Sequence, residues 1–207
     1  MFFIDRYYIM TVKLYDAIKS SYGNKKSKNK ILAEGYIKDK KLSSGNQKVF
    51  YNPGDKKLLV NIAGTHNLKD VATDVNLAFG NLKKTSRYKE AKKVLEKAKK
   101  KYDGSDVTVT GHSLGGSIGS GITSKKDKFL GFDSGYTLGQ QTRNYDGFKH
   151  YRTAGDLVSI LGSGAKDMQT LKGPKKGISD YIGGPLFSAY NSHLHYDNIK
   201  KIPIWIN

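Results

Sequence analysis

The stretch that decides the fold reads Val107-Thr108-Val109-Thr110-Gly111-His112-Ser113-Leu114-Gly115-Gly116. Its β-branched start favours a strand, and the small residues that follow Ser113 favour a tightly packed helix. Between them stands the pattern Gly-x-Ser-x-Gly, which is typical of a very tight turn from strand to helix. Glycine is needed two residues before and after the serine because the backbone passes itself closely there. The sequence therefore predicts a strand, a tight turn and a helix over residues 107–121.

Two serines fit the pattern, because Gly115-Gly116-Ser117-Ile118-Gly119 also matches it. Ser113 directly follows the predicted strand, whereas Ser117 would lie one turn inside the helix. A serine on such a turn presents its hydroxyl for nucleophilic attack, and the N–H of the next residue, Leu114, is aimed at the developing oxyanion. We therefore interpret Ser113 as a nucleophile; the alternative is a glycine-rich turn without chemistry.

The flanking sequence alternates predicted strands and helices. A turn at 52–55 separates two strands, of which the second is the apolar run 58–63. Further strands are predicted at 129–132 and 148–153, helices at 1–22, 67–82 and 86–102 with Ser86 as N-cap, and a loop at 20–30. This alternation predicts an α/β fold, a mostly parallel central sheet flanked by helices, in one domain over residues 1–207.

A nucleophilic serine needs a histidine to accept its proton and an acid to orient that histidine, in the chain order Ser, acid, His. Asp156 follows a predicted strand, where parallel sheets place their chemistry, and is our first choice for the acid. Asp133 also ends a strand and is the second choice, with a plain turn residue as its alternative. The other candidates are the acids Asp127 and Asp146 and the histidines His150, His193 and His195. His150 lies within a strand and precedes Asp156, so the base is predicted among His193 and His195.

These motifs, in this order, resemble the class 3 lipase family over residues 58 to 200. Four segments carry the resemblance: Ile62-Ala63-Gly64-Thr65 with the acidic run 69–74, Gly111 to Gly116, Gly155-Asp156-Leu157-Val158, and Ser192-His193-Leu194-His195-Tyr196. A fifth, Gly135 to Arg143, is similar to the family's Thr-x-Gly-x-Pro-Arg segment. The chain departs from the family at Val71, where tryptophan is usual, at Gln141-Thr142, which replace one proline, and at Ser159, which replaces another.

The resemblance implies an α/β-hydrolase fold with a Ser113-Asp156-His193 triad, so that it favours His193 over His195. It also implies an oxyanion hole made by Thr65 and the N–H of Leu114, and no cofactor or metal. The expected activity is hydrolysis of carboxylic esters of lipids, by a lipase or phospholipase. The alternative is a catalytically silent hydrolase fold that serves as a binding or structural module. The apolar segment 182–190 is a candidate acyl-chain wall or an ordinary packed loop.

The net charge of the chain indicates which kinds of binding partner to expect. The chain has 36 Lys and Arg against 18 Asp and Glu, a formal charge of +18. This surplus favours anionic phospholipid surfaces or nucleic acid, unless the lysines are merely solvated. No nucleic-acid motif is recognisable, so we expect lipid ester substrates, peripheral contact with anionic membranes and no specific nucleic acid.

Two further observations concern compartment and source. The chain has no cysteine, and the sequence shows no membrane span and no secretory signal. We therefore expect retention in the cell or release without processing. The composition, rich in Lys, Asn, Tyr and Ile, is typical of an AT-rich genome and suggests a small virus-encoded protein, found in host cytoplasm or virion.

Overall fold

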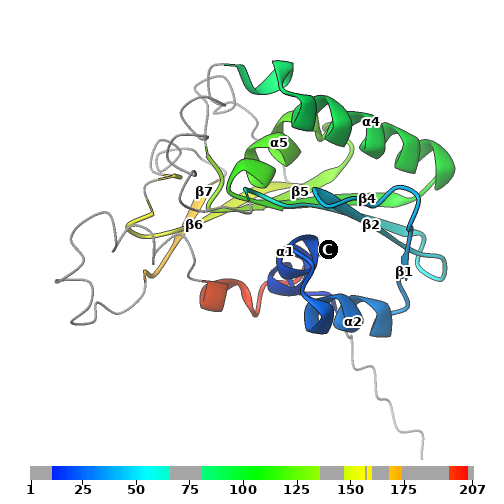
Figure 1. Cartoon of the computed structure of the whole chain (residues 1–207). Coiled ribbons are helices and arrows are strands. Elements are labelled where there is room, and N and C mark those ends of the chain that lie inside the picture. Colours follow the sequence, from blue (N-terminus) through cyan, green and yellow to red (C-terminus); the bar gives the residue numbers. More distant parts are fainter. Residues whose placement is uncertain are drawn as a thin grey trace, which may run out of the picture.

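The computed structural model describes residues 11–65, 81–135, 147–156, 158–159, 168–173 and 196–204. Its centre is a seven-stranded sheet in which the strands follow the chain order, β1-β2-β3-β4-β5-β6-β7 (Figure 1). The strands are β1 Ile37–Lys38, β2 Gln47–Asn52, β3 Lys57–Ile62, β4 Asp106–His112, β5 Lys128–Phe132, β6 Phe148–Thr153 and β7 Met168–Leu171. Strands β1 to β3 pair antiparallel and β3 to β7 pair parallel, so the predicted mostly parallel sheet is confirmed.

Helices cover both faces of this sheet (Figure 1). One face carries α4 Ser86–Lys101 and α5 Leu114–Ile122, preceded by the short 3-10 helix η2 Leu82–Lys84. The other face carries α1 Leu14–Ser21, α2 Lys25–Ala33 and the 3-10 helix η5 Tyr196–Ile199 near the C-terminus. We call these the α4 face and the α1 face. Among the described residues, no helix is both long and apolar enough to cross a bilayer.

Each face has its own hydrophobic core, because neighbouring residues of a strand point to opposite sides. On β2, Val49 packs into the core of the α4 face and Phe50 into that of the α1 face. On β5, Phe129 and Leu130 divide in the same way. The strand β4 differs, since Val107 and Val109 join the α4-face core whereas its remaining buried side chains are polar.

Most predicted elements are confirmed, and two predictions are wrong. Residues 20–30 are not a loop, because α1 runs to Ser21 and α2 begins at Lys25. The helix α2 buries only Ser27 and Ile31, which leaves no apolar period to read, and the Asn24 side chain caps it by accepting from Ser27 N at 2.9 Å. The N-cap of α4 is Thr85 and not Ser86. The predicted helix 67–82 lies largely outside the described residues.

A strip of buried polar side chains runs beneath α1. On β4, Thr110 Oγ1 donates to Asn61 Oδ1 of β3 at 2.9 Å, and Asn61 Nδ2 donates to Ser20 Oγ of α1 at 2.9 Å. All three side chains are buried. Buried polar groups of this kind fix one register and one helix orientation, because any shift would leave them without partners. This strip leads along β4 toward His112 and Ser113.

Candidate active site

Ser113 stands at the junction of β4 and α5, as the sequence predicts. Its backbone has φ 55° and ψ −130°, a conformation that non-glycine residues rarely adopt and that the surrounding structure must impose. Its N–H donates to Phe132 O at 3.1 Å, and its carbonyl accepts from Ser117 N at 3.1 Å. The turn is therefore held by β5 on one side and by the first turn of α5 on the other.

The glycines around Ser113 are required by space. A Cβ atom on Gly111 would collide with the backbone of Gly115, and one on Gly115 would collide with the carbonyls of Ile62 and Ala63. These are the positions two before and two after the serine, as the pattern predicts. Ser117, the second match, lies inside α5, where its hydroxyl donates to Gly135 O at 2.6 Å.

The predicted oxyanion residues lie beside Ser113. Leu114 is the first residue of α5, so its N–H has no intrahelical acceptor. Gly64, just before Thr65, packs against the turn: a Cβ atom there would lie 3.1 Å from Ser113 Cβ. Within the described part of the chain, the buried hydroxyls of Ser113 and Thr65 have no hydrogen-bond partner. Buried hydroxyls without a partner are uncommon in native proteins, and here two of them lie on adjoining segments.

Both candidate acids lie at the carboxyl ends of strands near Ser113. Asp156 comes three residues after the end of β6 and is fully buried, and its Oδ2 accepts from Ser159 N at 2.7 Å and Ser159 Oγ at 2.5 Å. Asp133 directly follows β5 and is also fully buried. Asp127 lies away from these ends, before β5, where it pairs with Lys99 at 2.7 Å. Asp146 lies outside the described residues.

The structure places one of the three histidines. His150 is buried in β6, with its ring 5.0 Å from that of Phe129 and 5.2 Å from that of Phe148. Burial lowers the pKa of His150 to about 3, so that it is neutral at pH 7 and belongs to the core of the α4 face. His193 and His195, the acidic run 69–74, the segment 182–190 and most of Gly135 to Arg143 lie outside the described residues.

A tyrosine–histidine cluster under the turn was not predicted. Tyr22 OH lies 2.8 Å from His112 Nδ1 and accepts from Gly64 N at 2.8 Å. Burial raises the pKa of Tyr22 to about 12, so the phenol is protonated at pH 7 where it shares a hydrogen bond with the imidazole. Tyr196 OH approaches the same nitrogen at 3.3 Å. The cluster thus connects His112, which precedes Ser113, with Gly64, which precedes Thr65, and no pattern in the sequence predicts it.

Arg87 supports the same segment from the α4 face. Its guanidinium donates to Ala63 O at 2.6 Å and Gly64 O at 3.3 Å. It lies in the first turn of α4, among residues that the sequence presents as an ordinary basic helix. The end of β3 is therefore held by Tyr22 through an N–H and by Arg87 through two carbonyls. This arrangement fixes the segment that leads to Thr65.

Comparison with known proteins agrees with this geometry. The family model described as Lipase (class 3) matches residues 56–125, a third of the chain, which contain β3, α4, β4 and α5. The fold is similar to the Lip2 lipase from Yarrowia lipolytica, with a TM-score of 0.52, 17% identity and 76% of each chain covered. The MDLA N225Q mutant from Penicillium cyclopium gives a TM-score of 0.56 at 14% identity, over 90% of this chain and 92% of that one.

A third similar structure is a fungal lipase from a family described for an unusual buried polar cluster. Its TM-score is 0.59 at 14% identity, over 93% of this chain and 95% of that one. No curated protein sequence matches the chain significantly. At these identities the structural likeness shows the fold, and the predicted α/β-hydrolase fold is confirmed. The family match supports the predicted resemblance to class 3 lipases.

Proposed function

We propose that this protein is a serine carboxylic-ester hydrolase of the class 3 lipase kind, which acts on lipid esters through Ser113, Asp156 and His193. The observation that carries the proposal is the turn at Ser113. A buried hydroxyl without a partner among the described residues sits on a strained strand-to-helix turn, beside the segment that leads to Thr65. Strain at such a position persists only where the surrounding structure imposes it, and it is concentrated at functional sites.

Tyr196 supports His193 as the base. Its ring centroid lies 5.1 Å from that of His112, next to Ser113 in the chain. His193 precedes Tyr196 by three residues, and three residues of chain span at most about 11 Å. We infer that a base in this segment can reach Ser113. The tether does not choose between the two histidines, because His195 directly precedes Tyr196, and His193 is preferred on the family resemblance alone.

The proposed reaction is acyl transfer to water. His193 accepts the proton of Ser113 while Oγ forms a bond to the ester carbonyl carbon, and the N–H of Leu114 and Thr65 stabilise the oxyanion. The ester C–O bond breaks as His193 returns the proton to the leaving alcohol. Water, activated by the same histidine, then attacks the acyl-enzyme and releases the acid. Asp156 stays ionised and orients the imidazole.

Labelling with a fluorescent fluorophosphonate tests the nucleophile. Because Ser113 is only 1% exposed, the reaction is run with and without lipid vesicles. We expect adduct on Ser113, identified by peptide mapping, and none in Ser113→Ala. That variant should lose about 10⁵-fold or more in kcat on a lipid ester and keep its unfolding midpoint. A folded wild-type protein that neither labels nor hydrolyses under either condition would favour the catalytically silent alternative.

We also propose that α4 brings the enzyme to anionic membranes. Its exposed stripe, spaced at steps of four, four and three, consists of Lys89, Lys93, Lys97 and Lys100. Within the described residues, no ion pair involves these lysines. Like charges four residues apart destabilise a helix, so that the stripe is unfavourable unless an anionic surface meets it.

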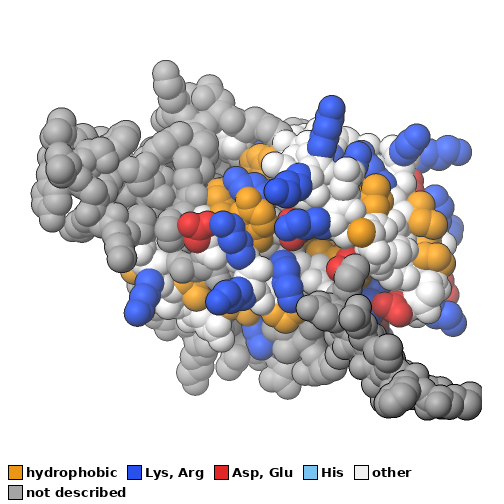
Figure 2. Space-filling model, turned by 90° about the horizontal axis from the view of Figure 1, so that it is seen from below, with side chains coloured by type: hydrophobic (Ala, Val, Ile, Leu, Met, Phe, Trp, Pro, Cys, Tyr) orange, Lys and Arg blue, Asp and Glu red, His pale blue; other side chains and the backbone are white. Residues whose placement is uncertain are grey.

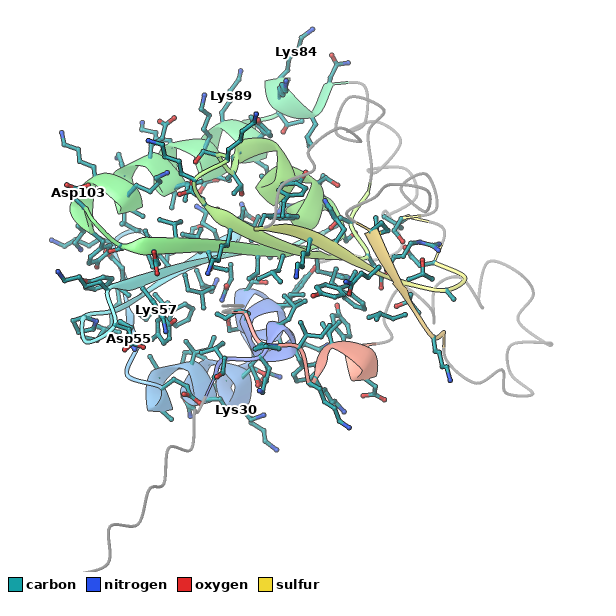
Figure 3. The ribbon with its side chains drawn as sticks, turned by 180° about the vertical axis from the view of Figure 1, so that it is seen from behind. Lys30, Asp55, Lys57, Lys84, Lys89 and Asp103 are labelled. Atoms are coloured by element: carbon teal, nitrogen blue, oxygen red, sulfur yellow. The ribbon has the colours of Figure 1, made fainter. Side chains whose placement is uncertain are left out.

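Lysines project from both faces of the molecule, so the proposal depends on where each set lies. On the α4 face, Lys84 and Lys89 project outward from the helices (Figure 3). Figure 2 shows the side that carries α2, where basic side chains are interspersed with hydrophobic and acidic ones. Lys30 on this side pairs with Asp16 at 3.3 Å. The start of α4 contacts the segment that leads to Thr65 through Arg87, so the lysine stripe begins beside the candidate site.

Matched double variants test this orientation. Lys93→Gln/Lys97→Gln and Lys25→Gln/Lys26→Gln remove the same charge from opposite faces. Each basic residue near an anionic bilayer contributes about 1 kcal/mol, so the α4 pair should lower binding to phosphatidylcholine–phosphatidylglycerol vesicles by roughly 10- to 30-fold. The α2 pair should change it by less than about threefold. Equal losses from both pairs, or steeply salt-dependent duplex DNA binding in place of vesicle binding, would contradict the proposal.

A further inference from the structure

Two fully buried carboxyl groups, Asp133 and Asp156, lie at neighbouring strand ends. Strands β5 and β6 pair in parallel with Phe132 opposite Tyr151, and each aspartate follows one of them. Thr153, the last residue of β6, contacts both. Its N–H donates to Asp133 Oδ1 at 2.6 Å, its hydroxyl lies 3.0 Å from Asp133 Oδ2, and its carbonyl accepts from Asp156 N at 3.1 Å. One threonine therefore ties the two acids together.

Among the described residues, Arg152 is the cation whose charge acts on Asp133, but its hydrogen bonds are made to other groups. Arg152 donates to the carbonyl oxygen of Asp156 at 3.2 Å and to Ser159 Oγ at 3.3 Å. The charge of Arg152 acts on Asp133 electrostatically. Within the described part of the chain, Arg152 forms no hydrogen bond or ion pair with the carboxyl group of Asp133. The other titratable groups whose charges act between these elements are Asp156 itself and the phenol of Tyr196 on η5.

Two negative charges in one dry site repel each other, although each carboxyl group accepts two hydrogen bonds from one residue, Asp156 from Ser159 and Asp133 from Thr153. For Asp133, burial and the charge of Asp156 raise the pKa well above its usual value, and the donors of Thr153 and the charge of Arg152 offset only part of this rise. In the proposed reaction Asp156 carries the negative charge, so the proton of the pair belongs on Asp133. Both donors of Thr153 point at this carboxyl, the N–H at Oδ1 and the hydroxyl at Oδ2. Because a hydroxyl can also accept, a protonated Oδ2 fits the same 3.0 Å separation with the direction of that one bond reversed.

We propose that Asp133 and Asp156 form a carboxyl pair with one proton and one negative charge, in which Asp133 holds the proton on Thr153 and acts as a positioning residue for Asp156. The inference rests on the proposed function, in which Asp156 orients the catalytic base. The neutral Asp133 anchors the end of β6, from which Asp156 emerges, without adding a second charge beside the imidazolium that forms in the reaction. If Asp156 is neutralised, the charge moves to Asp133.

The protonation state is measured directly in the resting protein, without substrate. Aspartate labelled with ¹³C at the carboxyl carbon is incorporated, and the carboxyl shifts are followed with pH. We expect one aspartate that is still protonated at pH 7, whose signal disappears in Asp133→Asn. In Asp156→Asn that signal should move to lower pH. An Asp133 signal that is already ionised at pH 7 in the wild-type protein would overturn the proposal.

Kinetics separate a positioning role from a merely structural one. Asparagine imitates the protonated acid toward Thr153, so Asp133→Asn should stay within about threefold of wild-type kcat/KM at pH 7. Asp156→Asn should lose about 10⁴-fold, and the double variant at least about tenfold more, because Asp133 no longer supplies the charge. A loss in Asp133→Asn equal to that in Asp156→Asn, or no added loss in the double variant, would refute the pair. An inactive wild-type protein would count against the proposed function alone, and the carboxyl titration would still decide the pair.

Discussion

Strand β4 presents different kinds of side chain to the two sides of the sheet, although helices cover both sides. Toward α4 and α5 the strand presents Val107 and Val109, which pack into an apolar core. Toward α1 it presents Thr110 and His112, whose side chains are bonded to Asn61 and Tyr22. Apolar packing stabilises without direction, whereas buried hydrogen bonds hold groups at fixed angles.

This difference indicates a division of labour. Both faces contribute stability through their apolar cores, and the α1 face in addition orients the end of the sheet where Ser113 and Gly64 meet. Arg87 is the exception, because it reaches from α4 to the carbonyls of Ala63 and Gly64. If the division holds, changes on the α4 face should alter the free energy of unfolding alone. Changes on the α1 face should alter the reaction as well.

The largest effects are expected from two phenylalanines of β5. Phe129 packs into the α4-face core, and Phe132 lies on the α1 face with its ring stacked 5.7 Å from that of His112. Truncating either to alanine should lower the free energy of unfolding by about 3–5 kcal/mol. Only Phe132→Ala should also lower kcat/KM of the folded enzyme, by roughly tenfold or more. Urea denaturation and initial rates on one lipid ester measure both quantities. Equal losses of kcat/KM in the two variants would contradict the proposed difference between the α4 face and the α1 face.

His150 makes the stability of the α4 face depend on pH. Burial lowers its pKa to about 3, while the unfolded chain binds the proton near the ordinary value of 6.5. The unfolded state therefore holds more protons between these values. Stability is fully present above pH 6.5 and falls toward pH 3, by about 1.4 kcal/mol per pH unit from this group.

The raised pKa of Asp133 acts in the opposite direction, since that carboxyl is more stable with its proton. The measurement is therefore the difference between wild type and His150→Leu, in which the contribution of Asp133 is unchanged. Unfolding free energies measured between pH 4.5 and 7 should converge or cross on acidification, at about the stated slope. Parallel curves would show that His150 binds its proton equally in the native and unfolded states, so that burial does not lower its pKa.

The tyrosine cluster gives a smaller but more selective effect. Tyr22→Phe removes the partner of Gly64 N–H and the nearer partner of His112 Nδ1, which should cost about 1–2 kcal/mol of stability. Because Gly64 precedes Thr65, we also expect kcat to fall by roughly tenfold, as loss of orientation at an oxyanion donor predicts.

The matched control is Tyr88→Phe on the α4 face. Its hydroxyl donates to Gly121 O at 2.9 Å, so the same oxygen atom is removed from a comparable bond on the other side of the sheet. Its stability loss should be similar, about 1 kcal/mol, with kcat unchanged. If both tyrosine variants slow the reaction equally, the α1 face has no special role in orienting the site.

The sequence predicted what short-range physics determines. Strands β3 to β6 follow from β-branched and apolar runs, and the turn at Ser113 follows from the glycines that its sterics require. Strand β7 was missed, because it is short and none of its side chains is fully buried. The fold class follows from their alternation. The helix α2 was missed because it buries only two side chains and leaves no apolar period.

The site was predictable only in its local part. Ser113, Leu114 and Thr65 come from contiguous motifs, and the structure brings their segments together. The contact of Tyr22 could not be predicted, because Tyr22 lies 90 residues before His112 and no local sequence pattern pairs them. The pairing of Asp133 with Asp156 likewise depends on the sheet order. Either acid satisfies the chain order of a triad, so the sequence offered them as rivals and not as partners.

The smallest predicted effect concerns the start of α4, where the sequence selected the wrong residue. Thr85 has extended backbone angles and its hydroxyl accepts from Tyr88 N at 3.2 Å, whereas Ser86 is already helical. Thr85→Ala should lower the free energy of unfolding by about 1 kcal/mol, and Ser86→Ala should change it by less than about half of that. Because the cap also sets the first turn that carries Arg87, a small rise in KM should accompany the first variant and not the second. A stability loss in Thr85→Ala without any kinetic change would mean that Arg87 keeps its hold on Gly64 without the cap, and the division between the two faces would then be complete.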